Sequence, residues 1–285
     1  MLATRTSEAG WATAGRRRAW GPAAGLAVLV SVGCGSQPAR LGVLVGQGEY
    51  QRVDAGPAPA DAPTRARDPA TGLPRVTGDL MPAPGEEQVV VRPGGQGITI
   101  VGADGVVRGG WATDAYVTAV GVIPVSSTSR LDVVLYLYPK PAGAGTFEVR
   151  SPGGERLATW VEAPPPSHFV VLRWQGRPVI GYLHGDSLVL RQADGTEAAR
   201  WPAPDGPLYT ELHALVRGTR LILLASGNGY TPYHMVLVYA ADGRLLFQDV
   251  EREQAFALEA DGPPDGAFVV TARSRRWRYD TGPAP

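Results

Sequence analysis

The chain has 285 residues with 27 basic and 27 acidic side chains, so its formal net charge at pH 7 is zero. Balanced charge does not favour nucleic acid as a partner, because it provides no large positive field. The single cysteine excludes an intramolecular disulfide, so the fold has to be stabilised by burial of apolar surface.

The N-terminus has the layout of an export signal. Three arginines at 16–18 precede an apolar segment, 19–32, which is too short for a permanent membrane span, and Gly33 and Cys34 follow it. The first 36 residues resemble the bacterial lipoprotein signal, although Ser31 stands where that family usually has leucine. The resemblance implies export, cleavage before Cys34 and a lipid on Cys34 that anchors the protein on the extracytoplasmic side of a membrane. An ordinary secretory signal, or a signal anchor with a free thiol, is the alternative.

Residues 35–85 are rich in proline, alanine, glycine, arginine and aspartate, and they contain little apolar surface to bury. Such a composition is typical of a flexible, partly extended chain. The sequence therefore predicts a signal over 1–34, a flexible tether over 35–85 and a folded domain over 86–285. The apolar patch 41–45 is the one place in the tether where a strand could form and pack on the domain.

From Glu86 onward, short runs of valine, leucine, isoleucine, tyrosine and tryptophan alternate with glycine, proline and Asp-Gly turns. This pattern is typical of strands, and the region has no helical period. We expect an all-β domain. No later segment is long and apolar enough to predict a membrane span.

Turns and aromatic residues repeat along this region. Four turns end in glycine, and three of them read Ala-Asp-Gly, a strong hairpin signal because tight primed turns need a positive φ. An aromatic residue follows the glycine by six positions in three units and by four in the last, and an even offset keeps it on one side of its strand. The pairs are Gly105 and Trp111, Gly154 and Trp160, Gly195 and Trp201, and Gly243 and Phe247.

The repeating unit contains four strands and recurs every 40 to 50 residues, which is the period of propeller blades. The segments Leu188–Trp201 and Val236–Phe247 resemble the quinoprotein-like and WD-repeat propellers of bacteria. A four-stranded sheet cannot bury both faces alone, so sheets stack around an axis, and the repeated aromatic residues are expected to fill the space between them. We predict a β-propeller of four to five blades, with a β-sandwich as the alternative. The partial first and last units suggest that the ring closes by joining them, with Glu87–Val91 contributing.

Two groups of residues are candidates for binding. The loop 227–234 interrupts a unit and carries Asn228, Tyr230, Tyr233 and His234, which suit recognition of a protein or a sugar. The alternative is an ordinary solvated loop. Four arginines around Trp277 could contact anionic lipid or polymer, or could line a solvated strand face: Arg273, Arg275, Arg276 and Arg278.

The sequence predicts no catalytic residue, no metal site and no cofactor. The four histidines are not at metal-ligand spacing, and no Gly-x-Ser-x-Gly motif is present. The carboxylates that a hydrolase could use have no distinctive spacing: Asp132, Glu162, Asp186, Glu211 and Glu259. We expect a lipid-anchored propeller that binds or scaffolds an envelope protein or glycan. The alternative is a lipid-anchored envelope hydrolase acting on a glycan or small ester.

Overall fold

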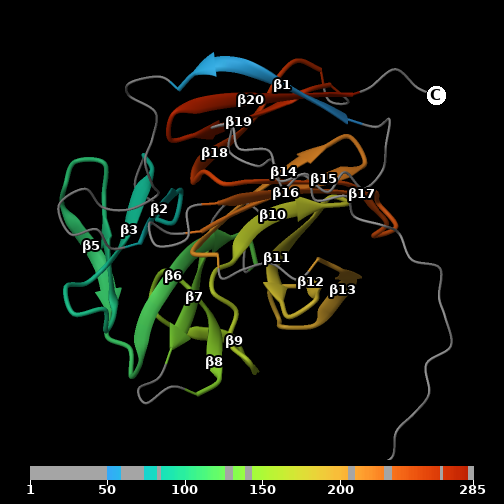
Figure 1. The fold of residues 1–285 in the computed structure, drawn as a ribbon. Helices are drawn as coiled ribbons and strands as arrows, with labels where there is room; N and C mark the ends of the chain where they lie inside the picture. Colours follow the sequence, from blue (N-terminus) through green and yellow to red (C-terminus); the bar gives the residue numbers. More distant parts are fainter. Residues whose placement is uncertain are drawn as a thin grey trace, which may run out of the picture. The chain divides into compact units, whose positions relative to one another are not determined.

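The computed structural model describes residues 50–58, 74–81, 85–125, 131–138, 143–204, 209–227, 233–263 and 266–281. These residues form twenty strands and no helix, arranged in five antiparallel sheets of four strands each (Figure 1). In this described part of the chain no helix could cross a membrane. The expected all-β fold is confirmed, whereas the predicted signal 1–34 and the patch 41–45 lie outside the described residues.

The sheets follow the chain, and each is called a blade here. Blade 1 contains β2 (Arg75–Gly78), β3 (Glu87–Val91), β4 (Ile98–Val101) and β5 (Val107–Trp111). Blade 2 contains β6 (Tyr116–Ile123), β7 (Asp132–Tyr138), β8 (Gly145–Arg150) and β9 (Arg156–Glu162). Blade 3 contains β10 (Val170–Trp174), β11 (Arg177–His184), β12 (Ser187–Arg191) and β13 (Glu197–Pro202). Blade 4 contains β14 (Glu211–Arg217), β15 (Arg220–Ser226), β16 (His234–Tyr239) and β17 (Leu245–Glu251). Blade 5 contains β18 (Ala255–Ala260), β19 (Phe268–Ala272), β20 (Arg275–Thr281) and β1 (Tyr50–Pro57).

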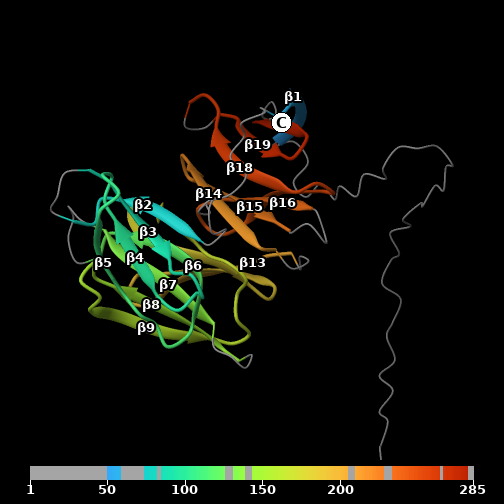
Figure 2. The same cartoon turned by 90° about the vertical axis from the view of Figure 1, so that its left-hand side faces the viewer.

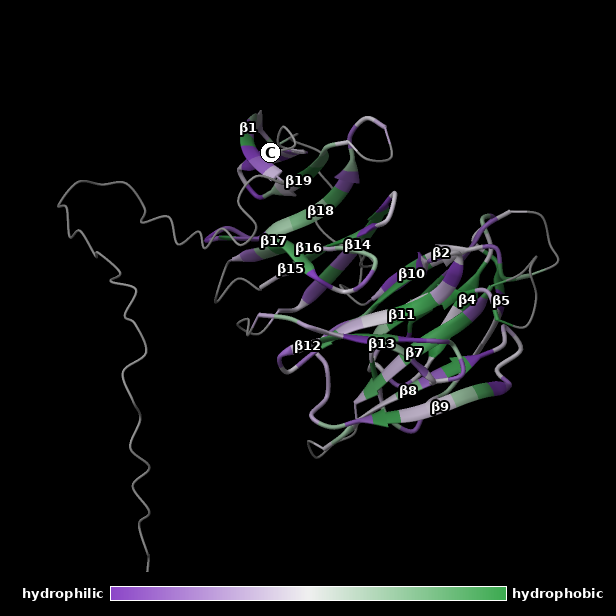
Figure 3. Cartoon of the chain, turned by 90° about the vertical axis from the view of Figure 1, so that its right-hand side faces the viewer, coloured by the Kyte–Doolittle hydropathy of each residue, from purple (hydrophilic) through white to green (hydrophobic). Residues whose placement is uncertain are grey.

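The first strands of successive blades lie next to one another. β2 contacts β6, β6 contacts β10, β10 contacts β14 and β14 contacts β18. The blades therefore follow one another in chain order around a common centre, as Figure 1 shows from the teal strands of blade 1 to the red strands of blade 5. Apolar residues concentrate on middle strands such as β7 and β16, which are almost entirely buried between blades (Figure 3). The fold is a five-bladed β-propeller.

β1 completes the blade formed by the C-terminal strands, so this blade contains segments from both ends of the described chain. β1 pairs antiparallel with β20, from Tyr50 opposite Thr281 to Asp54 opposite Trp277. The expectation that Glu87–Val91 closes the ring is wrong, because that segment forms β3 inside blade 1.

The prediction of a flexible tether over 35–85 is also wrong in two places, because residues Tyr50–Pro57 form β1 and Arg75–Gly78 form β2. β1 could not be predicted from the sequence, because this strand lies at the outer edge of its sheet and buries few side chains besides Tyr50. A strand that buries few side chains needs few apolar residues, so the usual sequence pattern of a strand is absent.

The four repeated turns share one geometry. In each, the glycine N–H donates to the carbonyl three residues earlier at 2.8 to 3.0 Å, and the glycine φ lies between +78° and +91°. The positive φ of these glycines is confirmed. The primed turn is wrong, because among the described residues only Gln175 is a non-glycine with positive φ. These are ordinary turns, and each pairing register shifts three residues after the glycine, where the outer strand of the hairpin carries a bulge.

Each repeated tryptophan packs against the turn of the next blade. Trp111 lies beside Gly154, Trp160 beside Gly195 and Trp201 beside Gly243. A Cβ placed on these glycines would lie 3.4, 2.9 and 2.2 Å from the neighbouring indole. Phe247 fills the next boundary, where its ring centre lies 5.7 Å from Tyr50 and 5.9 Å from Tyr279. The prediction that these aromatic residues fill the space between blades is confirmed.

Candidate functional site

A groove lies where the outer strand of blade 3 meets the β16–β17 turn of blade 4, on both sides of Trp201. One side encloses about 590 Å³ and is lined by Pro202, Pro204, Leu245, Arg200 and Arg244, among others. The other side encloses about 360 Å³, with Trp174, Trp201 and Arg177 in its lining. The two hollows share Trp201, which we treat as the centre of one site, the Trp201 groove.

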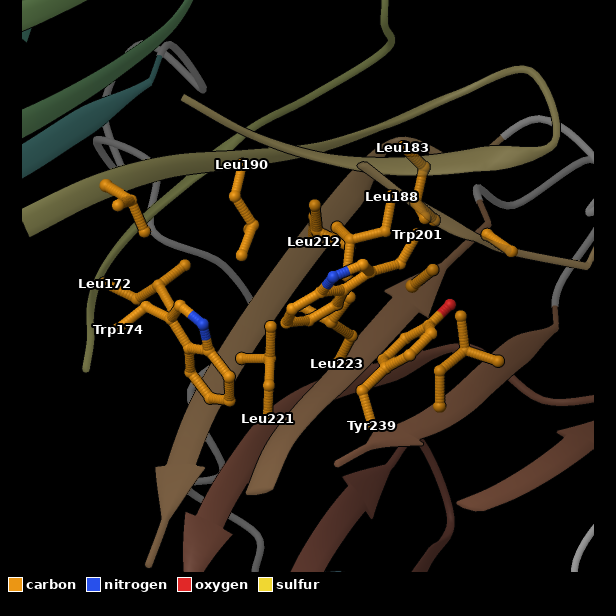
Figure 4. Close-up of a cluster of buried hydrophobic side chains, with 14 of the residues drawn as sticks. Leu172, Trp174, Leu183, Leu188, Leu190, Trp201, Leu212, Leu221, Leu223 and Tyr239 are labelled. Carbon is orange, nitrogen blue, oxygen red and sulfur yellow. The ribbon is translucent and has the colours of Figure 1, made fainter. Parts of the chain in front are cut away.

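The floor of the Trp201 groove is rigid because its aromatic side chains pack against one another. Trp201 is 8% exposed, and its ring centre lies 5.4 Å from that of Trp174 in an edge-on arrangement. Tyr239 of blade 4 lies 5.5 Å from Trp201, and its hydroxyl donates to the Pro202 carbonyl at 3.2 Å. Figure 4 shows these three rings among the leucines of β11, β12 and β15. Trp201 is therefore almost entirely buried, and only a small part of it reaches the surface.

The rim of the groove carries arginines in two different states. Arg200 donates two hydrogen bonds to the Glu197 carboxylate, at 3.1 and 2.7 Å, which fixes both side chains and lowers the pKa of Glu197. Arg177 and Arg244 are exposed and form no ion pair with the described part of the chain. The groove thus combines an apolar floor with cationic groups that are still able to bind a carboxylate.

The predicted binding loop is only partly visible. Asn228 and Tyr230 lie outside the described residues, whereas Tyr233 and His234 are buried. The His234 Nδ1 lies 2.7 Å from the Glu253 carbonyl oxygen, and burial lowers the pKa of this imidazole. These two side chains belong to the core of blade 4. A binding role for the loop stays a prediction.

Three of the four arginines around Trp277 pair with acidic neighbours. Arg275 pairs with Asp54 at 3.6 Å and Arg276 with Glu259 at 3.6 Å. Arg278 pairs with Asp261 at 3.1 Å and with Asp280 at 2.8 Å. This pairing favours the solvated strand face over a site for anionic polymer. Asp54 could not be assigned from the sequence, because it arrives with β1.

The carboxylates considered for hydrolysis have structural partners. Glu162 of blade 2 accepts hydrogen bonds from the Tyr182 hydroxyl at 2.5 Å and from Arg191 Nε at 2.9 Å, both in blade 3. Burial raises the pKa of Tyr182, so its hydroxyl stays a donor. Asp249 of blade 4 is bound in the same way by Tyr279 and Arg52 of blade 5, at 2.9 and 2.7 Å. Both buried clusters join neighbouring blades.

The other candidates are dispersed. Asp132 accepts a hydrogen bond from the Val125 N–H, Asp186 from the Ser187 hydroxyl, and Glu259 pairs with Arg276. Within the residues that the structure describes, no group of three or more His, Cys, Asp or Glu side chains could hold a metal ion. Burial lowers the pKa of His213, as it does for His234. Sequence reasoning did not identify the Trp201 groove. It assigned Trp201 only to packing between blades, and nothing local to that residue indicates an open surface beside it.

These features define a five-bladed β-propeller with an aromatic groove at the boundary of two blades. No protein-family model matches the chain, and no curated protein matches it. Two solved structures of BBS1N in complex with ARL6DN are similar in fold. The one soaked with lead is 16% identical over 75% of this chain and 66% of that chain, with a TM-score of 0.48. The one soaked with mercury is 14% identical over 76% and 67%, with a TM-score of 0.49. The chain thus spans about two thirds of the length of the chains it matches.

Proposed function

We propose that the protein is an exported binding module that a lipid on Cys34 anchors at the cell envelope, and that it holds a protein partner in the Trp201 groove. The observation that carries the proposal is the groove itself, in which a rigid aromatic floor lies beside Arg177 and Arg244, two exposed arginines that form no ion pair with the residues that the structure describes. Export and anchoring are supported by the signal-like N-terminus.

The chemistry of the groove suits an extended protein segment that carries apolar and acidic side chains. Trp201, Pro202, Pro204 and Leu245 offer apolar surface, and tryptophan is enriched among residues that dominate binding energy. Arginine binds carboxylates with two parallel hydrogen bonds, and Arg244 is exposed and without an ion pair in the described part of the chain. A partner segment that places a leucine or phenylalanine beside Trp201 and a carboxylate near Arg244 would use both features.

Charge reversal in the groove tests this function. In intact cells that produce the full-length protein, we expect Arg244→Glu to reduce cross-linked recovery of the partner by about tenfold, because a charge-assisted hydrogen bond contributes about 1.5–3 kcal/mol. Arg108→Glu is the matched control, since Arg108 is exposed on the outer strand of blade 1 and pairs only with Asp104 among the described residues. Quantitative mass spectrometry of the recovered proteins measures the change. Equal recovery of every partner with both variants would contradict the proposed groove.

Anchoring is tested separately at Cys34. Growth with a fatty-acid analogue is expected to label the wild-type protein and to leave Cys34→Ala unlabelled, because the thiol is the proposed site of attachment. The same substitution should move the protein from the membrane fraction to the soluble extracytoplasmic fraction. Label that persists after Cys34→Ala discards the lipid at this residue without affecting the groove.

A further inference from the structure

Blades 1 and 2, which lie side by side in Figure 2, enclose a cavity of about 200 Å³. Its lining comes from the connection between β5 and β6, from β7 and from β8, and includes Thr113, Leu137, Glu148 and Arg150. Glu148 is 5% exposed, and its carboxylate pairs with Arg150 Nε at 2.7 Å and with Arg156 Nη2 at 2.9 Å. A buried carboxylate and a guanidinium therefore border this cavity next to an apolar wall.

Two other boundaries between blades contain such a charged pair together with a tyrosine hydroxyl. Between blades 2 and 3, the Tyr182 hydroxyl donates to Glu162 at 2.5 Å and accepts from Arg191 Nε at 2.7 Å. Between blades 4 and 5, the Tyr279 hydroxyl donates to Asp249 at 2.9 Å, and the same carboxylate binds an arginine at 2.7 Å. At both places the carboxylate and the arginine therefore hold a phenolic hydroxyl.

The register of the strands places Arg150 and Arg191 in equivalent positions. Each arginine lies four residues before the glycine of its turn, and its Nη1 donates to the carbonyl oxygen of that glycine, at 2.9 Å for Arg150 and 2.7 Å for Arg191. On the neighbouring strand, the residue two positions beyond the one that pairs with the arginine is Tyr182 in blade 3 and Leu135 in blade 2. The boundary of blades 1 and 2 thus keeps the arginine and has a leucine in place of the tyrosine.

The carboxylate at this boundary comes from a different strand. Glu162 lies two residues after Trp160 in the outer strand of blade 2, and the equivalent residue that follows the outer strand of blade 1 is Thr113. The acid is supplied by Glu148 of β8 instead. A leucine in place of the tyrosine and a threonine in place of the glutamate remove side-chain volume at two positions, which explains why space remains at this boundary.

We propose that this cavity, called the Glu148 pocket, binds a phenolic hydroxyl, either of a free phenol or of a tyrosine side chain of a partner protein. The hydroxyl donates to the Glu148 carboxylate and accepts from the Arg150 guanidinium, in the way that Tyr182 is bound. The ring packs against Leu137. A neutral hydroxyl suits the pocket better than a carboxylate does, because Glu148 already places a negative charge there.

The size of the Glu148 pocket limits the ligand. Its volume is below the about 300–1,000 Å³ that drug-sized ligands occupy, so the bound group contains about one ring. The pocket shares no lining residue with the Trp201 groove, so binding here is independent of the partner proposed for that groove.

Titration with p-cresol tests the ligand chemistry. In the detergent-solubilised, full-length protein, with micelles alone as the blank, we expect p-cresol to bind at one saturable site. Toluene has the same ring and methyl group without the hydroxyl, and it should bind at least about tenfold more weakly, because hydrogen bonds to charged groups are the stronger ones. Isothermal titration calorimetry measures both affinities. N-acetyltyrosinamide distinguishes the two sources: binding as tight as that of p-cresol indicates a tyrosine side chain, and binding of p-cresol alone indicates a free phenol.

Two substitutions locate the site. Leu135→Tyr supplies the hydroxyl that Tyr182 provides in blade 3, so it should fill the Glu148 pocket and abolish p-cresol binding. Glu148→Gln keeps the shape of the side chain but removes its negative charge, and it should weaken binding by about tenfold. Glu259→Gln is the matched control, because it makes the same change at an arginine pair of blade 5 and should bind p-cresol as the wild type does.

Circular dichroism and unfolding midpoints establish that the variants are folded. If Leu135→Tyr does not fold, the comparison of Glu148→Gln with Glu259→Gln still decides the question. The absence of saturable p-cresol binding to the wild type, equal affinity for p-cresol and toluene, or equal binding by the wild type and Glu148→Gln overturns the proposal. Arg244→Glu, which tests the Trp201 groove, should leave p-cresol binding unchanged, so failure of either proposal can be recognised separately.

Discussion

Replacing β1 by a glycine–serine segment of equal length is expected to lower the free energy of unfolding by more than about 5 kcal/mol, a large part of the 5–15 kcal/mol typical of a domain. β1 supplies the only described outer strand of blade 5 and pairs with β20 from Tyr50 to Asp54. Its Arg52 also binds Asp249 of blade 4, so blades 4 and 5 lose a buried ionic contact together with the strand. Guanidinium unfolding followed by tryptophan fluorescence measures the change.

Point substitutions at Tyr50 identify which part of β1 is responsible. The ring is 5% exposed and packs on Phe247 and Phe268 at 5.7 and 5.5 Å. Tyr50→Ala should therefore cost about 3–5 kcal/mol, as large aromatic truncations do. Tyr50→Phe removes only the hydrogen bond from Arg220 and should cost about 0.5–1.5 kcal/mol. An unchanged unfolding midpoint in the glycine–serine variant would show that the ring does not depend on β1.

Gly243→Ala is expected to destabilise the fold by about 3–4 kcal/mol, whereas Gly105→Ala should cost about 1–2 kcal/mol. The two glycines occupy the same turn position with φ of +87° and +78°, so the backbone penalty is shared. They differ in their surroundings. A Cβ on Gly243 would lie 2.2 Å from the Trp201 indole, whereas a Cβ on Gly105 would meet nothing within 4 Å.

A double-mutant cycle isolates the contact with the indole. In a Trp201→Ala background the extra cost of Gly243→Ala should disappear, because the space of the indole is then free. The free energies of unfolding of the four proteins, from denaturant titrations, give the coupling directly. Equal costs at Gly105 and Gly243 would mean that the preceding blade does not constrain the turn.

The repeat could be read from the sequence because its determinants are local. The Asp-Gly turns and the aromatic residues at even offsets from the turn glycines lie within a single hairpin, and they predicted strands and blades correctly. The origin of the outer strand of blade 5 could not be read in this way. β1 is short of apolar residues, and its partner β20 lies at the other end of the chain, so no local pattern connects Tyr50 with Thr281.

The site was harder to predict for a related reason. Trp201 was assigned correctly to the boundary between blades, but the groove beside it forms only when β13 meets the turn before Leu245. The arginines around Trp277 suggested a positive surface, and their neutralisation depends in part on Asp54, which comes from β1. Contacts between distant segments therefore decide which charged and aromatic side chains remain available at the surface.

The position of β1 also sets the length of the linker that would connect a lipid on Cys34 to the propeller. Between Cys34 and the first residue of β1 lie only residues 35–49, which span at most about 50 Å when fully extended. Residues beyond Pro57 add nothing to this reach, because they connect two strands of the same ring. Insertions before Tyr50 would lengthen this linker, whereas insertions after Pro57 would only enlarge a loop. Mechanical tension on the anchor would act on the pairing of β1 with β20.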